Sequence, residues 1–246
     1  MKGGKYHEIK KVFQRKETKY LLSSEQFQPF LGALQQRMKV DEYGQHTILS
    51  LYYDTDDFRF IRHSMDKPKY KEKFRIRSYG VPSQDSLVFL EIKKKVNGIV
   101  YKRRVPLSYS DYQSWIRSGE FPTTIQPLQI AAEIRWLFKQ NHDLSPRVLI
   151  AYDRLSLFAS EDSEFRVTFD QNIRYRENNL TLSEGSYGQL IAPEIGVLME
   201  VKAMGAYPLW FVEQLNQYSV RKASFSKYAQ TYQRHLFKKE DIQNVI

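Results

Sequence analysis

The sequence of 246 residues contains no cysteine, and its 9 Pro and 11 Gly are too few for a low-complexity or collagen-like chain. The absence of cysteine excludes disulfides, thiolate zinc sites, iron–sulfur clusters and a cysteine nucleophile, and it fits a reducing cytoplasm. No stretch approaches the roughly 20 apolar residues that cross a bilayer, and the N-terminus MKGGKYHEIKKVF lacks the apolar part of a signal peptide. We therefore expect a cytoplasmic protein with no membrane segment of its own, held at the inner face of a membrane only where a separate membrane protein binds it.

The usual nucleotide and metal motifs are also missing. There is no Walker A sequence and no GxGxxG, so the glycine-rich loops that commonly cradle nucleotide phosphates are absent. The five histidines are scattered without metal-ligand spacing. Ser224 to Lys227 matches the SxxK pattern, but the other signals of penicillin-binding-type enzymes are missing, which disfavours a serine nucleophile.

Positive charge is in excess, because 38 Lys and Arg stand against 28 Asp and Glu, which gives a formal net charge of +10. Such a balance favours a polyanionic partner: a nucleic acid, an acidic lipid or a phosphate-rich small molecule. A generally basic surface is the alternative. The placement of the charges along the predicted strands has to distinguish between these.

Strand-like segments follow one another closely, with helices between some of them. Asn97-Gly98 between two such segments is a strong hairpin signal. Close succession of strands favours an antiparallel sheet or barrel over a parallel βαβ array. We predict an α+β fold that forms a single domain over residues 1–246. The predicted strands cover 19–22, 47–55, 71–79, 87–95, 99–107, 147–158, 164–175 and 196–203, and the predicted helices cover 25–38, 56–63, 110–118, 127–139, 208–218 and 226–237.

Charged and apolar side chains alternate along the predicted strands. Phe74 and Ile76 lie on one face of their strand and Arg75 and Arg77 on the other, because successive side chains point to opposite faces. The pattern recurs along the chain, usually with one carboxylate in the charged row. One interpretation is the solvated outer face of a sandwich, and the other is a barrel with a charged lumen and an apolar outside covered by helices. Because small barrels normally fill their lumen with apolar side chains, a cationic lumen has to stay wet or hold an anion.

Phosphate is favoured over nucleic acid as that anion. The guanidinium group of Arg binds two phosphate oxygens at once, and Lys supplies a mobile charge. A surface that binds nucleic acid has, in addition, exposed aromatic residues or a recognition helix. Most strand aromatics alternate away from the charges, as core residues do. Carboxylates within a cationic row suit a divalent cation that bridges them to phosphate oxygens, although simple pairing with Lys and Arg explains them equally well. The candidate carboxylates are Glu17, Glu91, Asp170 and Glu200.

Nine short motifs follow one another along nearly the whole chain. They are RKETKY at 15–20, LYYDT at 51–55, KYKEKFRIRSYG at 69–80, FLEIKKK at 89–95, YKRRVPL at 101–107, YDR at 152–154, FRVTFD at 165–170, LMEVK at 198–202 and FSKY at 225–228. In this order they resemble the polyphosphate polymerase (VTC) domain family of the triphosphate tunnel metalloenzyme superfamily; no single motif is specific, but the ordered set is. The resemblance implies an antiparallel β-barrel tunnel with helices on the outside, Mn²⁺ or Mg²⁺ as cofactor, and transfer of the γ-phosphate of ATP to inorganic polyphosphate.

The resemblance also implies site residues by position. Four basic residues are implied as catalytic, namely Lys93, Arg75, Arg77 and Arg166. Substrate contacts are expected from Lys19, Arg62, Lys102, Arg104, Arg154, Lys202, Ser226 and Lys227. For the metal, Glu200 falls at the family's metal-binding glutamate, and Glu17 and Glu91 are further candidates.

The chain departs from the family pattern at some of these positions. The placement of Arg62 depends on a gap, and Arg104 competes with Lys102 for one position. The family often has a basic residue where this chain has Ser224, which puts the helix-side contacts in doubt. Of the superfamily's ExExK only Glu17-x-Lys19 is present, which argues against a fully typical triphosphatase metal site.

Three functions share the same anion cradle. The first is a polymerase whose partners are ATP and polyphosphate, with no nucleic acid. The second is a triphosphate or polyphosphate hydrolase, which needs a water positioned by metal or by a carboxylate such as Glu17 or Glu91. The third is a non-catalytic polyphosphate or inositol-phosphate sensor. The sequence leaves the product length, the oligomeric state and any partner protein undetermined.

Overall fold

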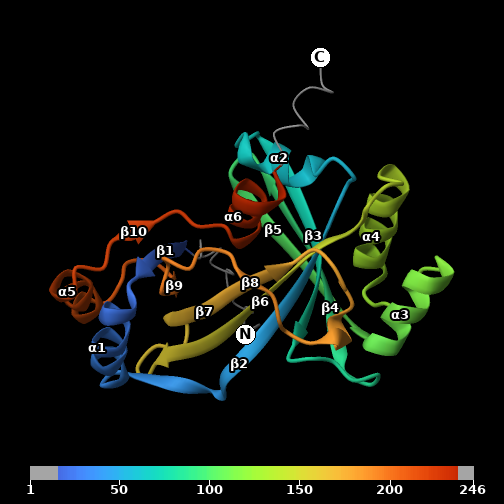
Figure 1. Cartoon of the computed structure of the whole chain (residues 1–246). Coiled ribbons are helices and arrows are strands. Elements are labelled where there is room, and N and C mark those ends of the chain that lie inside the picture. The colour runs from blue at the N-terminus through green and yellow to red at the C-terminus, as the bar shows by residue number, and fades with distance from the viewer. Residues whose placement is uncertain (1–15, 238–246) are drawn as a thin grey trace, which may run out of the picture.

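The computed structural model describes residues 16–237, in which ten strands form one antiparallel sheet (Figure 1). The strands are β1 (Lys16–Leu22), β2 (Met38–Asp54), β3 (Tyr70–Tyr79), β4 (Leu87–Val96), β5 (Ile99–Ser108), β6 (Ser145–Ala159), β7 (Arg166–Arg176), β8 (Gln189–Leu190), β9 (Val197–Ala203) and β10 (Lys222–Ala223). The helices are α1 (Ser24–Gln35), α2 (Arg59–Met65), α3 (Tyr109–Ser118), α4 (Leu128–Gln140), η1 (Leu182–Glu184), α5 (Leu209–Gln217), α6 (Lys227–Thr231) and η2 (Tyr232–Leu236). The strand order is β10-β1-β9-β7-β6-β2-β3-β4-β5, with β8 on β7. This antiparallel sheet with helices confirms the predicted fold class.

The hairpin between β4 and β5 forms where Asn97-Gly98 predicts it. Val96 and Ile99 face each other at its end, and both turn residues have positive φ, 47° at Asn97 and 89° at Gly98. A two-residue turn of this kind matches the twist of the paired strands and favours Asn and Gly. The turn sets the register of the whole hairpin.

Helices cover the apolar face of the sheet, which we call the outer face. The helices α3 and α4 pack on β2 to β5, in a core that includes Phe74, Ile76 and Trp115. The helices α1 and α5 pack on β1, β7 and β9 around Phe30 and Phe169. The alternation at Phe74 and Ile76 therefore predicts the outer face correctly. In residues 16–237 no helix is both long and apolar enough to cross a membrane.

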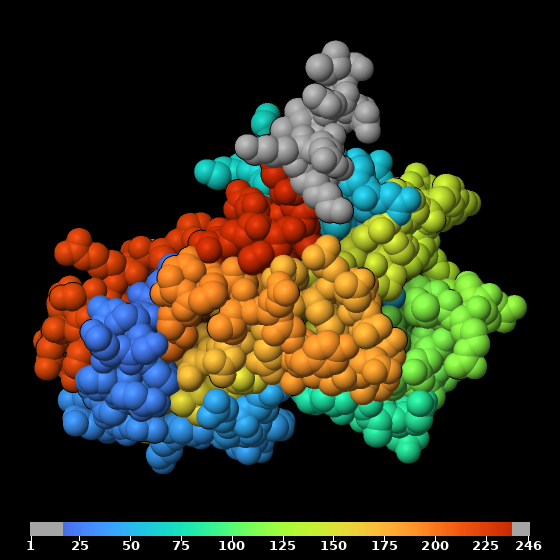
Figure 2. All heavy atoms as spheres, in the orientation of Figure 1, coloured from blue at the N-terminus to red at the C-terminus, as the bar shows by residue number. Residues whose placement is uncertain are grey.

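The C-terminal segment α6–η2 packs on the opposite face of the sheet, which we call the inner face. Tyr228 of α6 stacks on Tyr52 of β2 with ring centroids 4.6 Å apart, and its hydroxyl donates to Asp54 Oδ2 at 2.8 Å. His235 of η2 stacks on Tyr175 of β7 and contacts the carbonyl of the β7–β9 connection at Ile191. The two segments lie side by side in Figure 2, in red and orange. Together they cover part of the inner face.

The sheet is not closed by hydrogen bonds, because its end strands β5 and β10 do not pair with each other in the described part of the chain. The segment α6 reaches across the inner face instead. Its Lys227 contacts Asp170 on β7, its Tyr228 contacts β2, and Lys73 on β3 lies 5.9 Å from the Tyr228 ring centroid. This arrangement is compatible with a tunnel.

Strand β2 is longer than predicted and begins at Met38. Its first half, MKVDEYGQH, is polar and mostly exposed, so it lacks the alternation that marks a half-buried strand. Pairing with β6 shifts register between Val40 and Gln45. Residues 177–195, between β7 and β9, contain only η1 and the two-residue β8.

Candidate functional site

The inner face of β3, β4 and β5 carries a group that we call the cationic wall: Arg75, Arg77, Lys102, Arg104 and Glu91. The register places Arg75 and Arg104 on either side of Glu91. Arg75 donates to Glu91 Oε2 from Nε at 2.8 Å and from Nη2 at 2.7 Å. The other three cations lie 3.5–3.9 Å from the carboxylate, and Glu91 itself is only 3% exposed. Burial alone would raise the pKa of Glu91, but the Arg75, Arg77 and Lys102 charges outweigh it and lower this pKa to about 2.

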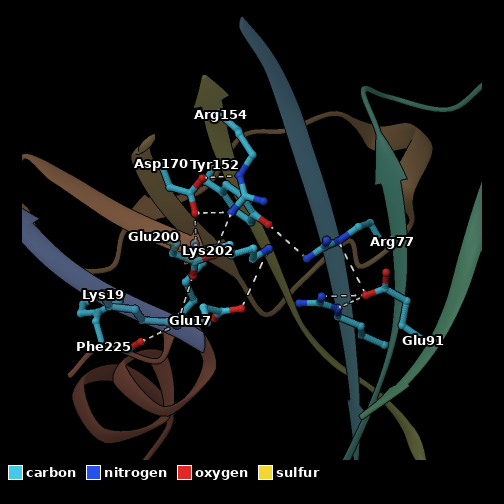
Figure 3. Close-up of polar contacts among 12 residues, drawn as sticks. Glu17, Lys19, Arg77, Glu91, Tyr152, Arg154, Asp170, Glu200, Lys202 and Phe225 are labelled. Atoms are coloured by element: carbon cyan, nitrogen blue, oxygen red, sulfur yellow. Dashed lines mark hydrogen bonds and ion pairs between the residues drawn. The ribbon is translucent and has the colours of Figure 1, made fainter. Parts of the chain in front are cut away.

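The inner face of β1, β6, β7 and β9, together with α6, carries a second group, the mixed wall: Lys19, Arg154, Lys227, Asp170 and Glu200. Figure 3 labels Lys19, Arg154, Asp170 and Glu200 of this group. Arg154 binds Asp170 bidentately, with Nε–Oδ1 at 2.5 Å and Nη2–Oδ2 at 2.7 Å. Lys227 Nζ lies 2.5 Å from Asp170 Oδ2, and Lys19 Nζ lies 3.1 Å from Glu200 Oε1. Arg154 also reaches Glu200 at 3.4 Å. The mixed wall is therefore one ion-pair network.

The oppositely charged groups of this network stabilise one another's charged forms. Burial raises the pKa of Asp170 and of Glu200, yet Lys227 and Arg154 lower both pKa values overall, and Lys19 lowers that of Glu200 further. Burial lowers the pKa of Lys227, but Asp170 and Glu200 raise it overall. Asp170, Glu200 and Lys227 are thus held in their charged forms at neutral pH.

Two tyrosines bind arginines of the cationic wall, and one of them, Tyr152, also contacts the mixed wall. The hydroxyl of Tyr152 accepts a hydrogen bond from Arg77 Nη2 at 3.2 Å, and its ring lies 4.2 Å from Lys227 Nζ and 5.2 Å from the Arg154 guanidinium carbon (Figure 3). The hydroxyl of Tyr52 accepts from Arg75 Nη1 at 2.9 Å. Burial raises the pKa of Tyr52, but Arg75 and Arg77 lower it overall. The tyrosines hold the arginine side chains in place and tie β2 and β6 to the site.

Several buried polar atoms of the inner face form no hydrogen bond within the described part of the chain. They are Nε of Arg77, Nε of Arg104, Oε1 of Glu91, Oγ of Ser50 and Oγ1 of Thr168. Such atoms are rare in folded proteins and call for an explanation. The cationic wall also has four cations for one carboxylate, a net charge of +3, whereas the mixed wall has three cations for two carboxylates, a net charge of +1. Unused donors and surplus positive charge together favour an anionic ligand with many acceptor oxygens.

The structure brings most of the predicted residues onto the inner face. Lys93 is exposed there, opposite Lys102. Lys202 lies between Arg166 and Glu17 on the neighbouring strands, and its Nζ is 3.9 Å from the Glu17 carboxylate. It is two residues from Glu200 on β9, so both side chains point to the same face. These residues extend the site along the strands. Whether they act in catalysis or binding stays a prediction.

Two predicted residues have other contacts. Arg62 lies on α2, where its Nη1 bonds the Asp57 backbone oxygen at 3.2 Å and side chain at 3.3 Å, and it contacts neither wall among residues 16–237. A gap in the motifs left this placement open. The helix α2 packs through Ile61 on the inner-face cluster of Tyr52 and Tyr228, but Arg62 itself pairs with Asp57. Ser226 caps α6 by accepting from the Ala229 amide at 3.4 Å.

Sequence reasoning missed three members of the inner face: Tyr52, Tyr152 and Lys73. Lys73 stands two residues before Arg75 on the same strand, so the alternation that identified Arg75 is also its signal. Burial lowers the pKa of Lys73 to about 8; Tyr52 opposes this shift, and Lys71 and Lys93 add to it. Tyr52 and Tyr152 lie in the motifs LYYDT and YDR, but neither was singled out, because aromatic residues in strands are typical of the core.

The carboxylates do not converge into a metal cage. No group of three His, Asp or Glu able to hold a metal ion occurs among the described residues. Glu91 is surrounded by cations, and Glu17 pairs with Lys202. Glu200 and Asp170 share Arg154 and Lys227, so their oxygens face a common point on the mixed wall. Each of the four oxygens of this pair lies beside at least one Lys or Arg nitrogen.

Comparison with known proteins shows the family and the fold. The family model of the VTC domain matches residues 14–236. HpAC1 from Hippeastrum, described as a candidate adenylyl cyclase with a dominant triphosphatase activity, aligns with a TM-score of 0.51 and 13% identity over 89% of this chain and 96% of its own. A candidate adenylate cyclase from Vibrio parahaemolyticus aligns with a TM-score of 0.47 and 12% identity over 89% of this chain and 97% of its own. No curated protein matches the sequence.

The family match confirms the resemblance inferred from the ordered motifs. It extends over nearly all of the described residues, and the solved structure with the TM-score of 0.51 shares the tunnel-type fold. The two walls lie on the inner face of that fold, as a triphosphate tunnel requires. The chain therefore belongs to the VTC domain family, within the triphosphate tunnel metalloenzyme superfamily.

Proposed function

We propose that this protein transfers the γ-phosphoryl group of ATP to a growing inorganic polyphosphate chain. The observation that carries the proposal is the cationic wall, where four cations share one buried carboxylate and two buried Nε atoms form no hydrogen bond among residues 16–237. A row of phosphates supplies both the negative charge and the acceptor oxygens that such a wall needs. Membership of the VTC family supports this assignment of substrate.

The reaction needs positioning and charge neutralisation rather than a covalent protein intermediate. Charge spreads over the oxygens of the transferred phosphoryl group, and in-line geometry joins donor and acceptor. Arg75 and Arg77 are fixed by Glu91, Tyr52 and Tyr152, so their guanidinium groups are oriented before the ligand arrives. Lys93 is exposed and unbranched, and we propose that it follows the charge as it moves between bridging and terminal oxygens.

A divalent ion belongs to this proposal, with Mn²⁺ or Mg²⁺ as candidates. Glu200 and Asp170 would hold it together with phosphate oxygens. When bound, the ion would neutralise charge on the phosphates. Glu17 lies one strand step from Lys19 and Glu200, and a contribution from it is part of the same proposal.

The hydrolase alternative has less support from the geometry. A hydrolase needs a base that activates water, and Glu91 with a pKa of about 2 is a weak base that is already engaged by Arg75. Glu17 is the other carboxylate proposed for this role, and it lies beside Lys202. A non-catalytic sensor would use the same walls, so only the products of the reaction separate the three functions.

The test is incubation of the protein with ATP and Mn²⁺, with and without a short polyphosphate primer. We expect ADP and a polymer that is visible on a gel, and little of either for Arg75→Ala. The matched control is Arg103→Ala, whose side chain faces the outer side and pairs with Glu133. ADP with stoichiometric free phosphate and no polymer would establish a hydrolase. Tight polyphosphate binding without ADP, including after addition of membrane extract as a source of a partner protein, would establish a sensor.

A further inference from the structure

The end of the β4–β5 hairpin carries exposed apolar side chains. Ile99, Val100 and Tyr101 are 42–58% exposed, although all three lie in strand β5. The register places Val96 of β4 between Tyr70 of β3 and Ile99 of β5, and Tyr70 is exposed as well. We call this group the apolar tip: Tyr70, Val96, Ile99, Val100 and Tyr101.

The apolar tip is exposed on both faces of the sheet. Ile99 and Tyr101 are an even number of residues from Arg103, which pairs with the outer helix α4, so they point to the outer face. Val100 alternates with them and points to the inner face. A folded partner that docks on a sheet covers one of its faces, whereas a surrounding fluid phase covers both. Exposure on both faces therefore favours a fluid phase.

Lysines accompany the apolar tip in the sequence. The segments 67–71 and 94–101 contain five lysines and neither Asp nor Glu, and Asp66 precedes the first segment. The lysines are Lys67, Lys69, Lys71, Lys94 and Lys95. The Lys69 backbone oxygen accepts from the Asn97 amide at 2.7 Å, so Lys69 lies level with the hairpin turn. Long lysine side chains lay their apolar stems along apolar surface and keep their charge outside it.

The carboxylates beside the apolar tip are engaged on the outer face. Glu72 accepts from the Tyr70 hydroxyl at 2.9 Å, and Glu133 lies 3.6 Å from Lys94 Nζ. The exposed ring of Trp136 on α4 continues the apolar surface, with its centroid 6.0 Å from the same Nζ. Tyr and Trp are the residues that membrane–water interfaces enrich. The tip thus combines apolar, interfacial aromatic and cationic side chains.

We propose that the apolar tip and its lysines bind an anionic lipid bilayer directly, with the tip in the interfacial region and the lysines against the headgroups. Apolar insertion and attraction to anionic lipid act together in such binding, and each lysine near the surface strengthens it about fivefold. The contact needs no separate membrane protein. It is independent of the proposed reaction, because it uses no residue of the cationic wall or the mixed wall.

The first test is co-sedimentation of the full chain with vesicles. One set contains equal parts of phosphatidylglycerol and phosphatidylcholine, and the other contains phosphatidylcholine alone. The native protein should bind the anionic vesicles about tenfold or more tightly than the neutral ones. The double variant Ile99→Ser, Val100→Ser should lose about tenfold or more of that affinity. The matched control is Leu209→Ser, which removes an exposed apolar side chain on α5 and should bind as the native protein does.

The second test reports whether the tip enters the bilayer. The chain has no cysteine, so Ile99→Cys provides a single attachment point for a dye that responds to polarity. Its emission should increase and shift to the blue when anionic vesicles are added. The same dye on the Leu209→Cys variant should show no such change.

Equal vesicle affinity of the native protein and the double serine variant would overturn the proposal. So would binding that falls in Lys67→Gln, Lys69→Gln without any shift of the dye at position 99, since the surface would then attract any anion. Absence of binding to both vesicles would also overturn it and would favour a protein partner for the tip. All substituted side chains are exposed, so folding should be retained; if the double variant does not fold, the dye on Ile99→Cys decides. Absence of polymer from ATP leaves these measurements unaffected, so the two proposals fail separately.

Discussion

The two walls differ in how they are charged and in how they are assembled. The cationic wall comes from one continuous stretch, β3 to β5, and carries a surplus of three positive charges around Glu91. The mixed wall combines β1, β6, β7, β9 and α6, and its two carboxylates nearly balance three cations. An anion gains more from the first wall, whereas the second already satisfies its own charges. We infer that the cationic wall mainly binds substrate, while the mixed wall mainly holds the fold together and offers carboxylates to a metal.

The largest expected effect is on stability, in the mixed wall. Asp170→Asn removes the partner of Arg154 and Lys227, which leaves two buried cations poorly compensated. We expect the free energy of unfolding to fall by about 3–5 kcal/mol, measured by urea denaturation. Glu161→Gln, at an exposed loop position, is the control. A loss below about 1 kcal/mol would show that the network is not a structural element of this wall.

The next effect is on binding, in the cationic wall. Arg75→Ala and Arg77→Ala should each weaken tripolyphosphate binding by about 10- to 150-fold, because a charge-assisted hydrogen bond contributes roughly 1.5–3 kcal/mol. Calorimetry measures this change, and Arg103→Ala on the outer face of β5 serves as control. Native affinity in both wall variants would mean that the wall is only surface charge.

The third prediction concerns the metal. Glu200→Gln keeps the shape of the side chain but removes the charge that a divalent ion requires. The Mn²⁺ concentration for half-maximal activity should rise about tenfold or more, while Glu213→Gln on the exposed side of α5 should not change it. An unshifted Mn²⁺ requirement would reduce Glu200 to an ion-pair partner of Lys19.

The fourth prediction concerns the contribution of Glu91 to the free energy of unfolding at acidic pH. Its pKa is lowered from 4.5 to about 2, so its stabilising contribution is complete above pH 4.5 and is lost as the pH falls through 2. The difference in unfolding free energy between the native protein and Glu91→Gln should therefore be largest near neutral pH and shrink between pH 4.5 and 2. A difference that stays constant over this range would contradict the assignment of Glu91 as the charged centre of its wall.

The smallest effect is a pH dependence of binding. The pKa of Lys73 is lowered to about 8, so this lysine loses its charge as the pH rises through 8. Affinity for long-chain polyphosphate should drop by roughly fivefold across that range, since one lysine contributes about 1 kcal/mol to binding of a polyanion. Lys73→Arg, which stays charged, should flatten the profile. The same profile in both proteins would exclude Lys73 as its source.

The cationic wall is also the part that the sequence predicted best. Alternation identified Arg75 and Arg77, and the Asn97-Gly98 turn aligned Glu91 with Arg104. The mixed wall was harder, because Lys227 and Asp170 are 57 residues apart and Lys19 and Glu200 come from opposite ends of the chain. Motif resemblance named these residues but could not pair them. Arg62 shows the limit of motif comparison. A gap between the motifs left its position uncertain, and in the structure α2 places it against Asp57.

The sequence by itself determined which side chains share a face, because the period of two along a strand is a local property. It also determined the short-range register of β4 and β5, because a two-residue turn permits few alignments. Only the tertiary structure decided which faces meet across the inner side and how Tyr152 links Arg77 to Lys227. Those contacts depend on the packing of α6 and of distant strands, which is the sum of many weak interactions that no local pattern encodes.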